Sequence, residues 1–509
     1  MFQFSPLKKN IDSLVAALVG FLIIFLFTRH GGIGISPDSV IYTSGAENLQ
    51  AHGSYIDFTN EAIIDFPVFY SILLAVISWL TQLKIFVFAP YLNALVFATV
   101  IFLTGNMIEL FAFRNKWYKA ALLACIILNP GLLEIYSMLW SETIFILFLV
   151  LFIMAMHRYI NAGSRKALLA AAIVTALACI TRYAGVCIIA SGGLVILLNS
   201  KFPWRKRLID GIIFGIIAAS LFVINISRNY QVSETFTGYR EQSVTSFTQN
   251  LHNTGIVFLN WIGITNYNDV VAVIIPAIII TALAVICLRN YFKEKAIGSF
   301  ETLTAFLALI YLLFIIITAT ISRFEALNSR FISPAFIFLL LGITSWMPTF
   351  FSQFSGKAKQ FAIATVVLIF LGFQFGQFDA DAKTWDMVKD AGIPGYTEDG
   401  WTQSPTVLFV EKNLISFKKN YTIYSDATDA IYWFTHRPGK YLPGKRDDIE
   451  IQEFLDDRHC YVVWFNDGED DDRIDKNFLT QVKKMKLIKQ FEDGSIYEYD
   501  SPFAGQVKD

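Results

Sequence analysis

Apolar runs of close to 20 residues recur along most of this 509-residue chain. A helix that crosses a bilayer needs about 20 consecutive, mostly apolar residues. Lipid offers the backbone no hydrogen-bond partner, so a run that lies in lipid must satisfy its own N–H and C=O groups as a helix. The composition agrees, because 16% of the residues are charged, against about 25% in soluble domains. The pattern predicts a polytopic α-helical membrane protein.

Basic residues fall on alternate loops between eleven such runs. The positive-inside rule assigns these loops to the cytoplasm and so favours eleven crossings from a cytoplasmic start. No small-residue cleavage site follows the first run, which we expect to be retained as an anchor. The predicted spans are residues 12–28, 86–110, 120–139, 143–160, 167–181, 184–200, 208–227, 270–288, 302–321, 331–348 and 360–377. The basic loops carry Lys8, Lys9, Arg114, Lys116, Lys119, Arg158, Arg165, Lys166, Lys201, Arg205, Lys206, Arg207, Arg289, Lys293, Lys295, Lys357 and Lys359.

The segment Phe66–Gln82 is also apolar, but counting it as a crossing would move every later basic loop outside. We interpret it as re-entrant or interfacial helices at the outer surface. It belongs to a long first outer loop, roughly 29–85. The third outer polar segment, roughly 228–269, is rich in Asn, Thr and Tyr.

After about residue 378 the charge rises and the apolar runs become short. Tyr421–Ser425, Cys460–Phe465 and Ile496–Tyr499 are short stretches rich in aromatic and β-branched residues, which is typical of strands. About 120 residues suffice for a small α/β domain. We therefore predict a transmembrane catalytic domain over residues 1–378 and an α/β domain over 379–509, which an odd number of crossings places outside the cytoplasm.

Two carboxylates, Asp38 and Glu142, lie on different outer loops. Each could simply cap a neighbouring helix, Asp38 together with Ser36 and Glu142 together with Ser141. Alternatively, Asp38 could take the proton of a hydroxyl that attacks a sugar carbon. Glu142 could then orient the acceptor or hold a divalent metal ion, the one possible cofactor that the residues suggest.

Arg182, Arg323 and Arg330 lie at the outer ends of spans. An arginine beside hydrocarbon is costly unless it snorkels to the interface or is paired, and snorkelling would explain these positions without a function. Guanidinium groups also grip phosphate in a forked geometry, and fixed positive charge would stabilise a phosphate leaving group. The arginines therefore indicate a lipid-phosphate site.

Several other classes of protein are disfavoured. The chain has no Walker motif, no Gly-rich phosphate loop and no Ser-His-Asp pattern, which argues against an ATP-driven transporter. The net charge of −1 gives no sign of nucleic-acid binding. The five cysteines and six histidines show neither metal-ligand spacing nor a disulfide framework.

Four stretches on the outer side carry a family resemblance, and the tail adds two more. The outer stretches are Ser36–Tyr42, Trp140–Phe145, Ile180–Gly185 and Ser329–Pro334, and the tail stretches are Tyr424–Asp426 and Trp433–Pro438. With them the chain resembles bacterial GT-C membrane glycosyltransferases, the group of protein O-mannosyltransferase-like and aminoarabinose-transferase-like enzymes.

The resemblance implies a multi-pass protein of the bacterial cytoplasmic (inner) membrane that takes a hexosyl or pentosyl group from a polyprenyl-phosphate carrier. Asp38 matches the catalytic acidic residue of the first outer loop, which would act as the base, and Glu142 matches the second outer acidic position. Arg182 and Arg330 match basic positions near the donor phosphate. We also expect substrate contacts from Tyr42, Glu61, Asp65 and Arg323.

Two departures leave the subfamily open. Ser39 follows Asp38 where mannosyltransferase-type members carry Asp-Glu, and Asp65-Phe66-Pro67 lacks the basic residue that aminoarabinose-transferase-type members carry before the proline. The acceptor, whether lipid, glycan or protein, stays open as well. Alternative functions are a flippase for lipid-linked sugars, a glycan polymerase or ligase with a diphosphate-linked donor, and a non-catalytic scaffold that displays the tail.

Overall fold

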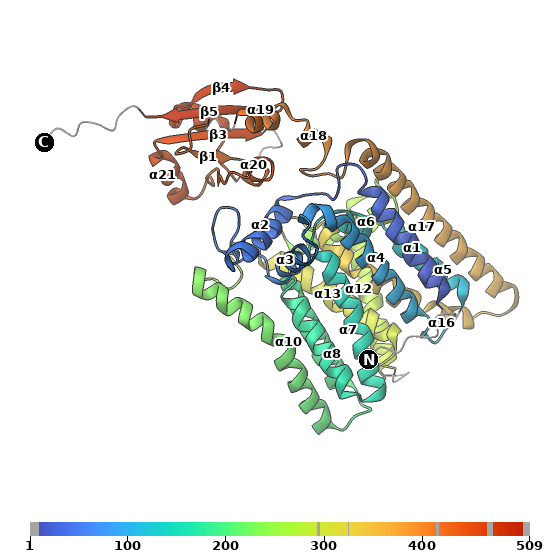
Figure 1. Ribbon diagram of the computed structural model, residues 1–509. Coiled ribbons are helices and arrows are strands. Elements are labelled where there is room, and N and C mark those ends of the chain that lie inside the picture. The colour runs from blue at the N-terminus through green and yellow to red at the C-terminus, as the bar shows by residue number, and fades with distance from the viewer. Residues whose placement is uncertain are drawn as a thin grey trace. The chain divides into compact units, whose positions relative to one another are not determined.

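The computed structural model describes residues 10–113, 115–292, 296–323, 325–413, 417–465 and 472–501. The chain divides into two compact units. The helical unit comprises Met1–Arg29 and Ile64–Asp390, and the sheet unit comprises His30–Ile63 and Ala391–Asp509. Figure 1 shows the elements of both. Five of the basic loop residues lie outside the described residues, namely Lys8, Lys9, Arg114, Lys293 and Lys295.

The helical unit is a bundle of apolar helices. They are α1 (Ile11–Phe27), α3 (Phe69–Thr81), α4 (Ile85–Ile108), α5 (Lys116–Ile127), α6 (Pro130–Ser137), α7 (Glu142–Ala162), α8 (Arg165–Cys179), η2 (Tyr183–Gly185), α9 (Val186–Leu198), α10 (Trp204–Ser233), α11 (Phe247–Trp261), α12 (Asp269–Phe292), α13 (Phe300–Ile321), α14 (Ser329–Ile332), η3 (Ser333–Ala335), α15 (Phe336–Thr344), α16 (Met347–Ser352) and α17 (Gly356–Ala391).

Among the described residues, six helices are long and apolar enough to cross a membrane, namely α4, α7, α10, α12, α13 and α17. The bent pair α5 and α6 makes a seventh span if it counts as one. The remaining predicted spans coincide with shorter helices, so the count of eleven crossings stays a prediction.

The predicted span 120–139 is broken where Pro130 begins α6. Asn129 accepts a hydrogen bond from the Leu132 N–H at 2.9 Å and so caps the new helix, which is bent by 51° from α5. Proline at the first helical position needs no N–H partner, whereas inside a helix it would remove a bond. The Asn-Pro pair therefore ends one helix and starts the next.

Small residues bring α1 and α4 into close contact. A Cβ atom added to Gly105 would lie 2.4 Å from the Ser13 Oγ, and one added to Gly20 would lie 2.2 Å from Ile101. The Asn10 Nδ2 also donates to the Asn106 Oδ1 at 2.7 Å. Close backbone approach through small residues and interhelical hydrogen bonds are typical of helix pairs in membranes.

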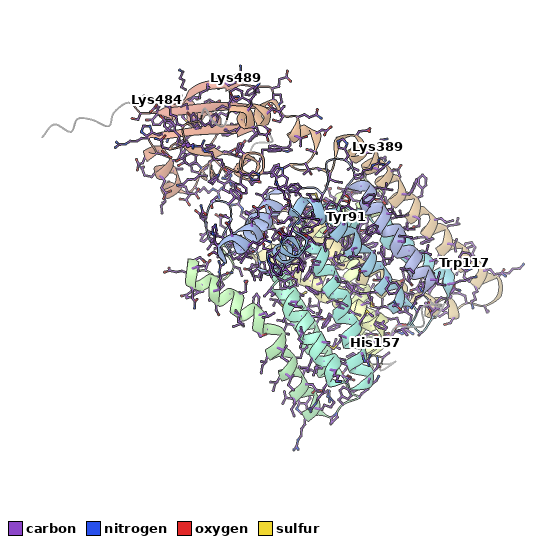
Figure 2. The ribbon with its side chains drawn as sticks, viewed as in Figure 1. Tyr91, Trp117, His157, Lys389, Lys484 and Lys489 are labelled. Atoms are coloured by element: carbon purple, nitrogen blue, oxygen red, sulfur yellow. The ribbon has the colours of Figure 1, made fainter. Side chains whose placement is uncertain are left out.

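Large apolar side chains cover the outside of the bundle. Figure 1 shows α10 and α17 at opposite edges of the helical unit, and most of their apolar surface is exposed. Tyr91 of α4 and Trp117 of α5 project outward and are 55% and 74% exposed (Figure 2). Lipid is the solvent that such a surface requires.

The helix α3 occupies most of the segment Phe66–Gln82. Its 13 residues span about 20 Å, short of the about 30 Å hydrocarbon core. The Phe69 N–H donates to the Ile180 carbonyl at 2.9 Å and ties the start of α3 to the loop after α8. The length agrees with an interfacial or re-entrant helix.

The sheet unit contains α2 (Pro37–His52), α18 (Asp399–Thr402), α19 (Pro405–Asn413), β1 (Thr422–Ser425), α20 (Thr428–Thr435), β2 (Lys440–Tyr441), α21 (Asp448–Asp456), β3 (His459–Phe465), η5 (Phe478–Val482), β4 (Lys486–Gln490) and β5 (Gly494–Asp500). The strand order is β2-β1-β3-β5-β4. The pairs β2–β1 and β1–β3 are parallel, and β3–β5 and β5–β4 are antiparallel.

Strand β3 is apolar from Cys460 to Phe465 because both of its faces are covered. Tyr461 and Val463 pack with residues of α19 and α20 on one side, and Cys460 and Val462 pack with residues of α21 and η5 on the other. Successive side chains of a strand point to opposite faces, so a central strand needs an unbroken apolar run. The predicted strand over Cys460–Phe465 is confirmed.

The segment His30–Ile63 joins the sheet unit through contacts with the tail. The Tyr396 N–H donates to the Ile35 carbonyl at 2.8 Å, and the Thr397 hydroxyl donates to the Ile33 carbonyl at 2.9 Å. The ring of Phe58 stacks on that of Tyr432 at 4.8 Å. The predicted first outer loop is thus divided between the two units, and residue 378 lies inside α17.

Asp426, at the end of β1, should make the sheet unit less stable as the pH rises. Burial raises the pKa of Asp426 to about 6, against about 4 in an unfolded chain. The folded state therefore holds its proton more tightly, and the stabilisation is complete below pH 4 and is lost as the pH rises through 6. We expect Asp426→Asn to raise the free energy of unfolding by about 2–3 kcal/mol at pH 7 relative to the wild type, and by little at pH 4.

Denaturant titrations of the full-length chain at both pH values, followed by near-UV circular dichroism, would test this. The asparagine can still accept from the Phe465 N–H, which donates to the Asp426 Oδ1 at 2.9 Å. A constant difference between the two proteins from pH 4 to 7 would contradict the assignment.

Candidate functional site

The buried carboxylate Glu142 begins helix α7. Its side chain is fully buried, although ionised carboxylates are rarely buried without a partner. The N-terminal turn of a helix favours negative charge, because its free N–H groups point toward the end of the helix. That preference is worth about 1 kcal/mol, too little to offset burial, so the carboxylate needs cationic partners.

Two arginines supply them. The Arg182 Nη1 lies 2.7 Å from the Glu142 Oε1, and the Arg330 Nε donates to the same oxygen. These three side chains, called here the arginine–glutamate cluster, come from the loop after α8, from α7 and from α14. The Arg182 Nη1 also donates to the Ser141 Oγ at 3.1 Å, and the Arg330 guanidinium lies 4.4 Å from the centre of the Trp140 ring.

The arginine–glutamate cluster carries one more positive than negative charge and has an open donor. Glu142 is fully buried, and the Arg182 and Arg330 side chains are 17% and 11% exposed. Among the residues that the structure describes, the Arg182 Nε is buried without a hydrogen-bond acceptor. A buried donor without an acceptor costs about 1–3 kcal/mol, which an anion such as phosphate would recover.

Glu134 of α6 is a further member of this neighbourhood that the sequence predictions missed. Its carboxylate hydrogen-bonds Ser329 and lies within electrostatic range of Arg330 and Glu142. The Glu134 side chain keeps surface that other protein atoms do not cover, although its carboxyl group has many protein atoms nearby. Glu134 brings a second carboxylate to the neighbourhood of the two arginines, so the four side chains together contain two acidic and two basic groups.

A signal for Glu134 was present in the sequence. It is an acidic residue inside an apolar span, in Pro130-Gly131-Leu132-Leu133-Glu134, and such residues are usually functional. A Cβ atom added to Gly131 would lie 2.1 Å from the Ser333 Oγ and 2.6 Å from the Ser329 Oγ. The glycine lets α6 approach the segment that carries Arg330.

A polar network fixes the chain on either side of Arg182. The Tyr183 hydroxyl donates to the Ile64 carbonyl at 2.6 Å. The Asn229 Nδ2 of α10 donates to that hydroxyl at 2.9 Å and to the Ile64 carbonyl at 3.2 Å. Asp65, a predicted substrate contact, therefore follows a residue anchored beside Arg182, and its Oδ1 lies 4.0 Å from the Arg240 Nη2.

Arg323 has a different partner. Its Nη1 lies 2.6 Å from the Glu241 Oε2, and its backbone N–H donates to the Glu241 carbonyl at 2.9 Å. The structure thus brings Arg182 and Arg330 together at Glu142 but pairs Arg323 with the loop after α10.

Three predicted site residues, Asp38, Tyr42 and Glu61, belong to the sheet unit. Asp38 is half-buried in the first turn of α2. The N-terminus of this helix is capped by a capping box of Ser36 and Ser39. The Ser39 hydroxyl accepts a hydrogen bond from the Ser36 N–H at 3.0 Å. The Ser39 hydroxyl therefore has a structural role beside Asp38.

Tyr42 and Glu61 differ in exposure. Tyr42 is 1% exposed, whereas Glu61 is exposed and its backbone N–H donates to the Asp57 Oδ1 at 3.1 Å. In the described part of the chain, no group of three or more His, Cys, Asp or Glu side chains could hold a metal ion.

No family model and no curated protein matches the sequence. Solved structures do match the fold. ArnT from Cupriavidus metallidurans bound to undecaprenyl phosphate superimposes with a TM-score of 0.56 at 14% sequence identity, over 97% of this chain and 98% of that one. Its apo state gives a TM-score of 0.55 at 14% identity over the same shares of the two chains.

The archaeal oligosaccharyltransferase AglB from Archaeoglobus fulgidus, in complex with an inhibitory peptide and a dolichol-phosphate, gives a TM-score of 0.55 at 11% identity. The match covers 91% of this chain and 70% of that one. These neighbours are GT-C glycosyltransferases. The chain therefore has the GT-C fold, and the resemblance that the outer motifs carry is confirmed at the level of fold.

Proposed function

From the GT-C fold and the arginine–glutamate cluster, we propose that the protein is a glycosyltransferase that moves one sugar from a polyprenyl-phosphate donor to an acceptor on the outer face of the membrane. The observation that carries the proposal is the pair of arginines on a single buried carboxylate, with an Arg182 N–H that has no acceptor among the described residues. Two solved neighbours contain undecaprenyl phosphate or dolichol-phosphate, which supports a lipid phosphate as the ligand.

In this proposal Asp38 accepts the proton of an acceptor hydroxyl as its oxygen attacks the anomeric carbon. The bond from that carbon to the phosphate oxygen breaks, and the electron pair leaves with the phosphate. Arg182 and Arg330 bind the departing phosphate and stabilise its charge. Glu142 is the accessory carboxylate that holds the two guanidiniums in register, so that they require no rearrangement during the reaction.

The proposed setting is the bacterial inner membrane, with the sheet unit outside the cytoplasm. In the helical unit, α3 would line the path by which the lipid carrier reaches the arginine–glutamate cluster. Asp65, held one residue after Ile64, would contact the sugar or the acceptor.

A flippase for lipid-linked sugars is the main competing function, and a polymerase or ligase with a diphosphate-linked donor is another. Arg182 and Arg330 could bind either a phosphate or a diphosphate. A flippase moves its ligand unchanged, whereas a transferase consumes it, so the fate of the donor separates these functions.

The purified protein should be incubated with a panel of polyprenyl-phosphate hexoses and pentoses, a diphosphate-linked oligosaccharide, and cell-envelope extract as the source of acceptor. Each mixture should be run with and without a chelator, which tests metal dependence. We expect at least one monophosphate donor to lose its sugar and to release free polyprenyl phosphate. If every donor stayed intact and the protein moved a lipid-linked sugar across the membrane of liposomes, the transferase proposal would be wrong and the flippase would take its place.

A further inference from the structure

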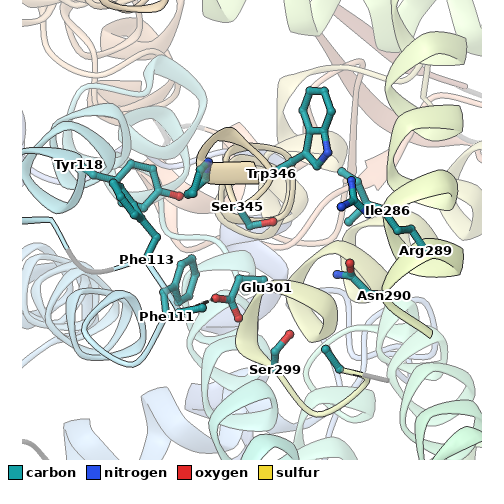
Figure 3. Close-up of a pocket in the computed structure, with 13 residues that line it drawn as sticks. Phe111, Phe113, Tyr118, Ile286, Arg289, Asn290, Ser299, Glu301, Ser345 and Trp346 are labelled. Atoms are coloured by element: carbon teal, nitrogen blue, oxygen red, sulfur yellow. Dashed lines mark hydrogen bonds between the residues drawn. The ribbon is translucent and has the colours of Figure 1, made fainter. Parts of the chain in front are cut away.

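A cavity of about 330 Å³ lies at the other end of the helical unit from the arginine–glutamate cluster, among loops that the charge pattern assigns to the cytoplasm. Its walls come from the loop after α4, from α5, from the α12–α13 connection and from the start of α16. Figure 3 shows the lining side chains, among them Arg289 of α12, Glu301 of α13 and Trp346, which directly precedes α16. None of these residues belongs to the site proposed for sugar transfer.

Among the described residues that line the cavity, one carries a positive charge and one a negative charge. Arg289 is in the last turn of α12 and Glu301 is in the first turn of α13. The Ala112 N–H donates to the Glu301 Oε1 at 2.8 Å, and in the described part of the chain this is the one hydrogen bond to that carboxylate. The Oε2 atom is therefore available to a cationic ligand.

Aromatic rings surround the two charges. Phe111, Phe113, Tyr118 and Trp346 line the cavity. The Phe113 and Tyr118 rings lie 5.6 Å apart in an edge-to-face arrangement, and the Tyr118 hydroxyl donates to the Thr344 Oγ1 at 3.0 Å. Aromatic faces attract ammonium groups, so the wall beside Glu301 suits a cation.

A second cavity of about 400 Å³ adjoins the first and shares Glu301 and Ser299 with it. It adds Lys201, whose Nζ donates to the Asn161 Oδ1 at 2.9 Å. Glu301 thus stands where the two cavities meet, with a cation in each. A ligand that is only anionic would be repelled at Glu301, whereas one that carries both signs would be satisfied.

Lipid-facing surface borders the first cavity. Val285, Leu288 and Phe292 of α12 are between 56% and 69% exposed, and Trp346 at the rim is 41% exposed. Tryptophan at the end of apolar helices is typical of the headgroup level of a bilayer. A headgroup in the cavity would leave its acyl chains along α12.

We propose that this cavity binds the headgroup of phosphatidylethanolamine, with the phosphate at Arg289 and the primary ammonium at Glu301. Basic pockets between membrane helices on the cytoplasmic side are known to take phospholipid headgroups, and the carboxylate here selects for an amine. The site is independent of the proposed sugar transfer.

Native mass spectrometry of the detergent-purified full-length protein would test the proposal, by titration with phosphatidylethanolamine, phosphatidylglycerol and free glycerophosphoethanolamine. We expect phosphatidylethanolamine to bind about 10-fold or more tightly than phosphatidylglycerol, which lacks the ammonium that would hydrogen-bond Glu301. It should also bind about 10-fold or more tightly than the free headgroup, which lacks the acyl chains that would lie along α12. Equal binding of phosphatidylglycerol, or of the water-soluble headgroup, would overturn it.

Variants separate the two ends of the ligand. Glu301→Gln still accepts from the Ala112 N–H and should lose the preference for the amine while keeping phospholipid binding. Arg289→Gln should weaken the binding of both phospholipids about 10-fold, and Arg289→Lys should restore most of the binding.

Arg165→Gln is the control. It removes an exposed cation from the start of α8, outside both cavities, and should leave the affinity for both phospholipids unchanged. Wild-type selectivity in Glu301→Gln would contradict the assignment of the ammonium.

Discussion

Asp38→Asn should reduce sugar transfer by at least about 100-fold and leave the protein folded and inserted. A positioned general base contributes roughly 10²–10⁴-fold to a reaction, and asparagine cannot accept the proton. Folding should survive, because Ser36 and Ser39 cap helix α2 without the carboxylate. Initial rates of polyprenyl-phosphate release, measured with the donor that the panel identifies, would give the loss.

Glu47→Gln provides the matched control for this variant. Glu47 is exposed on the same helix and loses the same charge when it becomes glutamine. We expect its transfer rate to stay within about twofold of the wild type. Full activity in Asp38→Asn would remove Asp38 from the mechanism, and an equal loss in both variants would point to net charge on α2 instead of proton transfer.

Glu142→Gln should be among the most destabilising single substitutions in the helical unit. It leaves Arg182 and Arg330 close together without the carboxylate that both of them contact. Removing one member of a buried ion pair costs about 3–5 kcal/mol, because the remaining charge stays desolvated. Denaturant titrations in detergent micelles would measure the lost free energy of unfolding.

Glu325→Gln serves as the comparison for this effect, since Glu325 is exposed on the loop that leads to α14. Surface substitutions are usually worth less than about 0.5 kcal/mol. If Glu142→Gln were equally mild, the arginine–glutamate cluster would not be a buried ion pair in the folded protein. Undecaprenyl phosphate should stabilise the variant by binding to its folded state, which links the stability measurement to the proposed ligand.

The positions of the apolar helices could be predicted because periodicity and length are local properties of a chain. Helical residues make up most of each predicted span, although several helices share the spans 120–139 and 331–348. The strands over Tyr421–Ser425, Cys460–Phe465 and Ile496–Tyr499 coincide with β1, β3 and β5. The break at Pro130 was missed, since the run 120–139 has apolar composition throughout. Helix α11 was also missed, because its polar face made residues 247–261 resemble the rest of an outer loop.

Most residues of the candidate site could be predicted from the sequence, but the contacts between them could not. Arg330 and Glu142 are separated by 188 positions in the chain, and Arg182 and Ser141 by 41. Which cation meets which acid depends on how α7, α8 and α14 approach one another, and no local pattern encodes that. Arg323 illustrates the same point, because sequence reasoning grouped it with Arg330, whereas its partner in the structure is Glu241.

The sheet unit is built from two segments that lie far apart in the chain, and this sets the order in which its parts are synthesised. His30–Ile63 leaves the ribosome early, whereas its partners after Ala391 follow more than 300 residues later. At about 5–20 residues per second, roughly 15–65 s separate the two parts. Helix α2, with Asp38, must wait through the insertion of the whole bundle before its own unit can close. The nascent chain would therefore contain all residues of the arginine–glutamate cluster well before the unit that holds Asp38, the proposed general base, could fold.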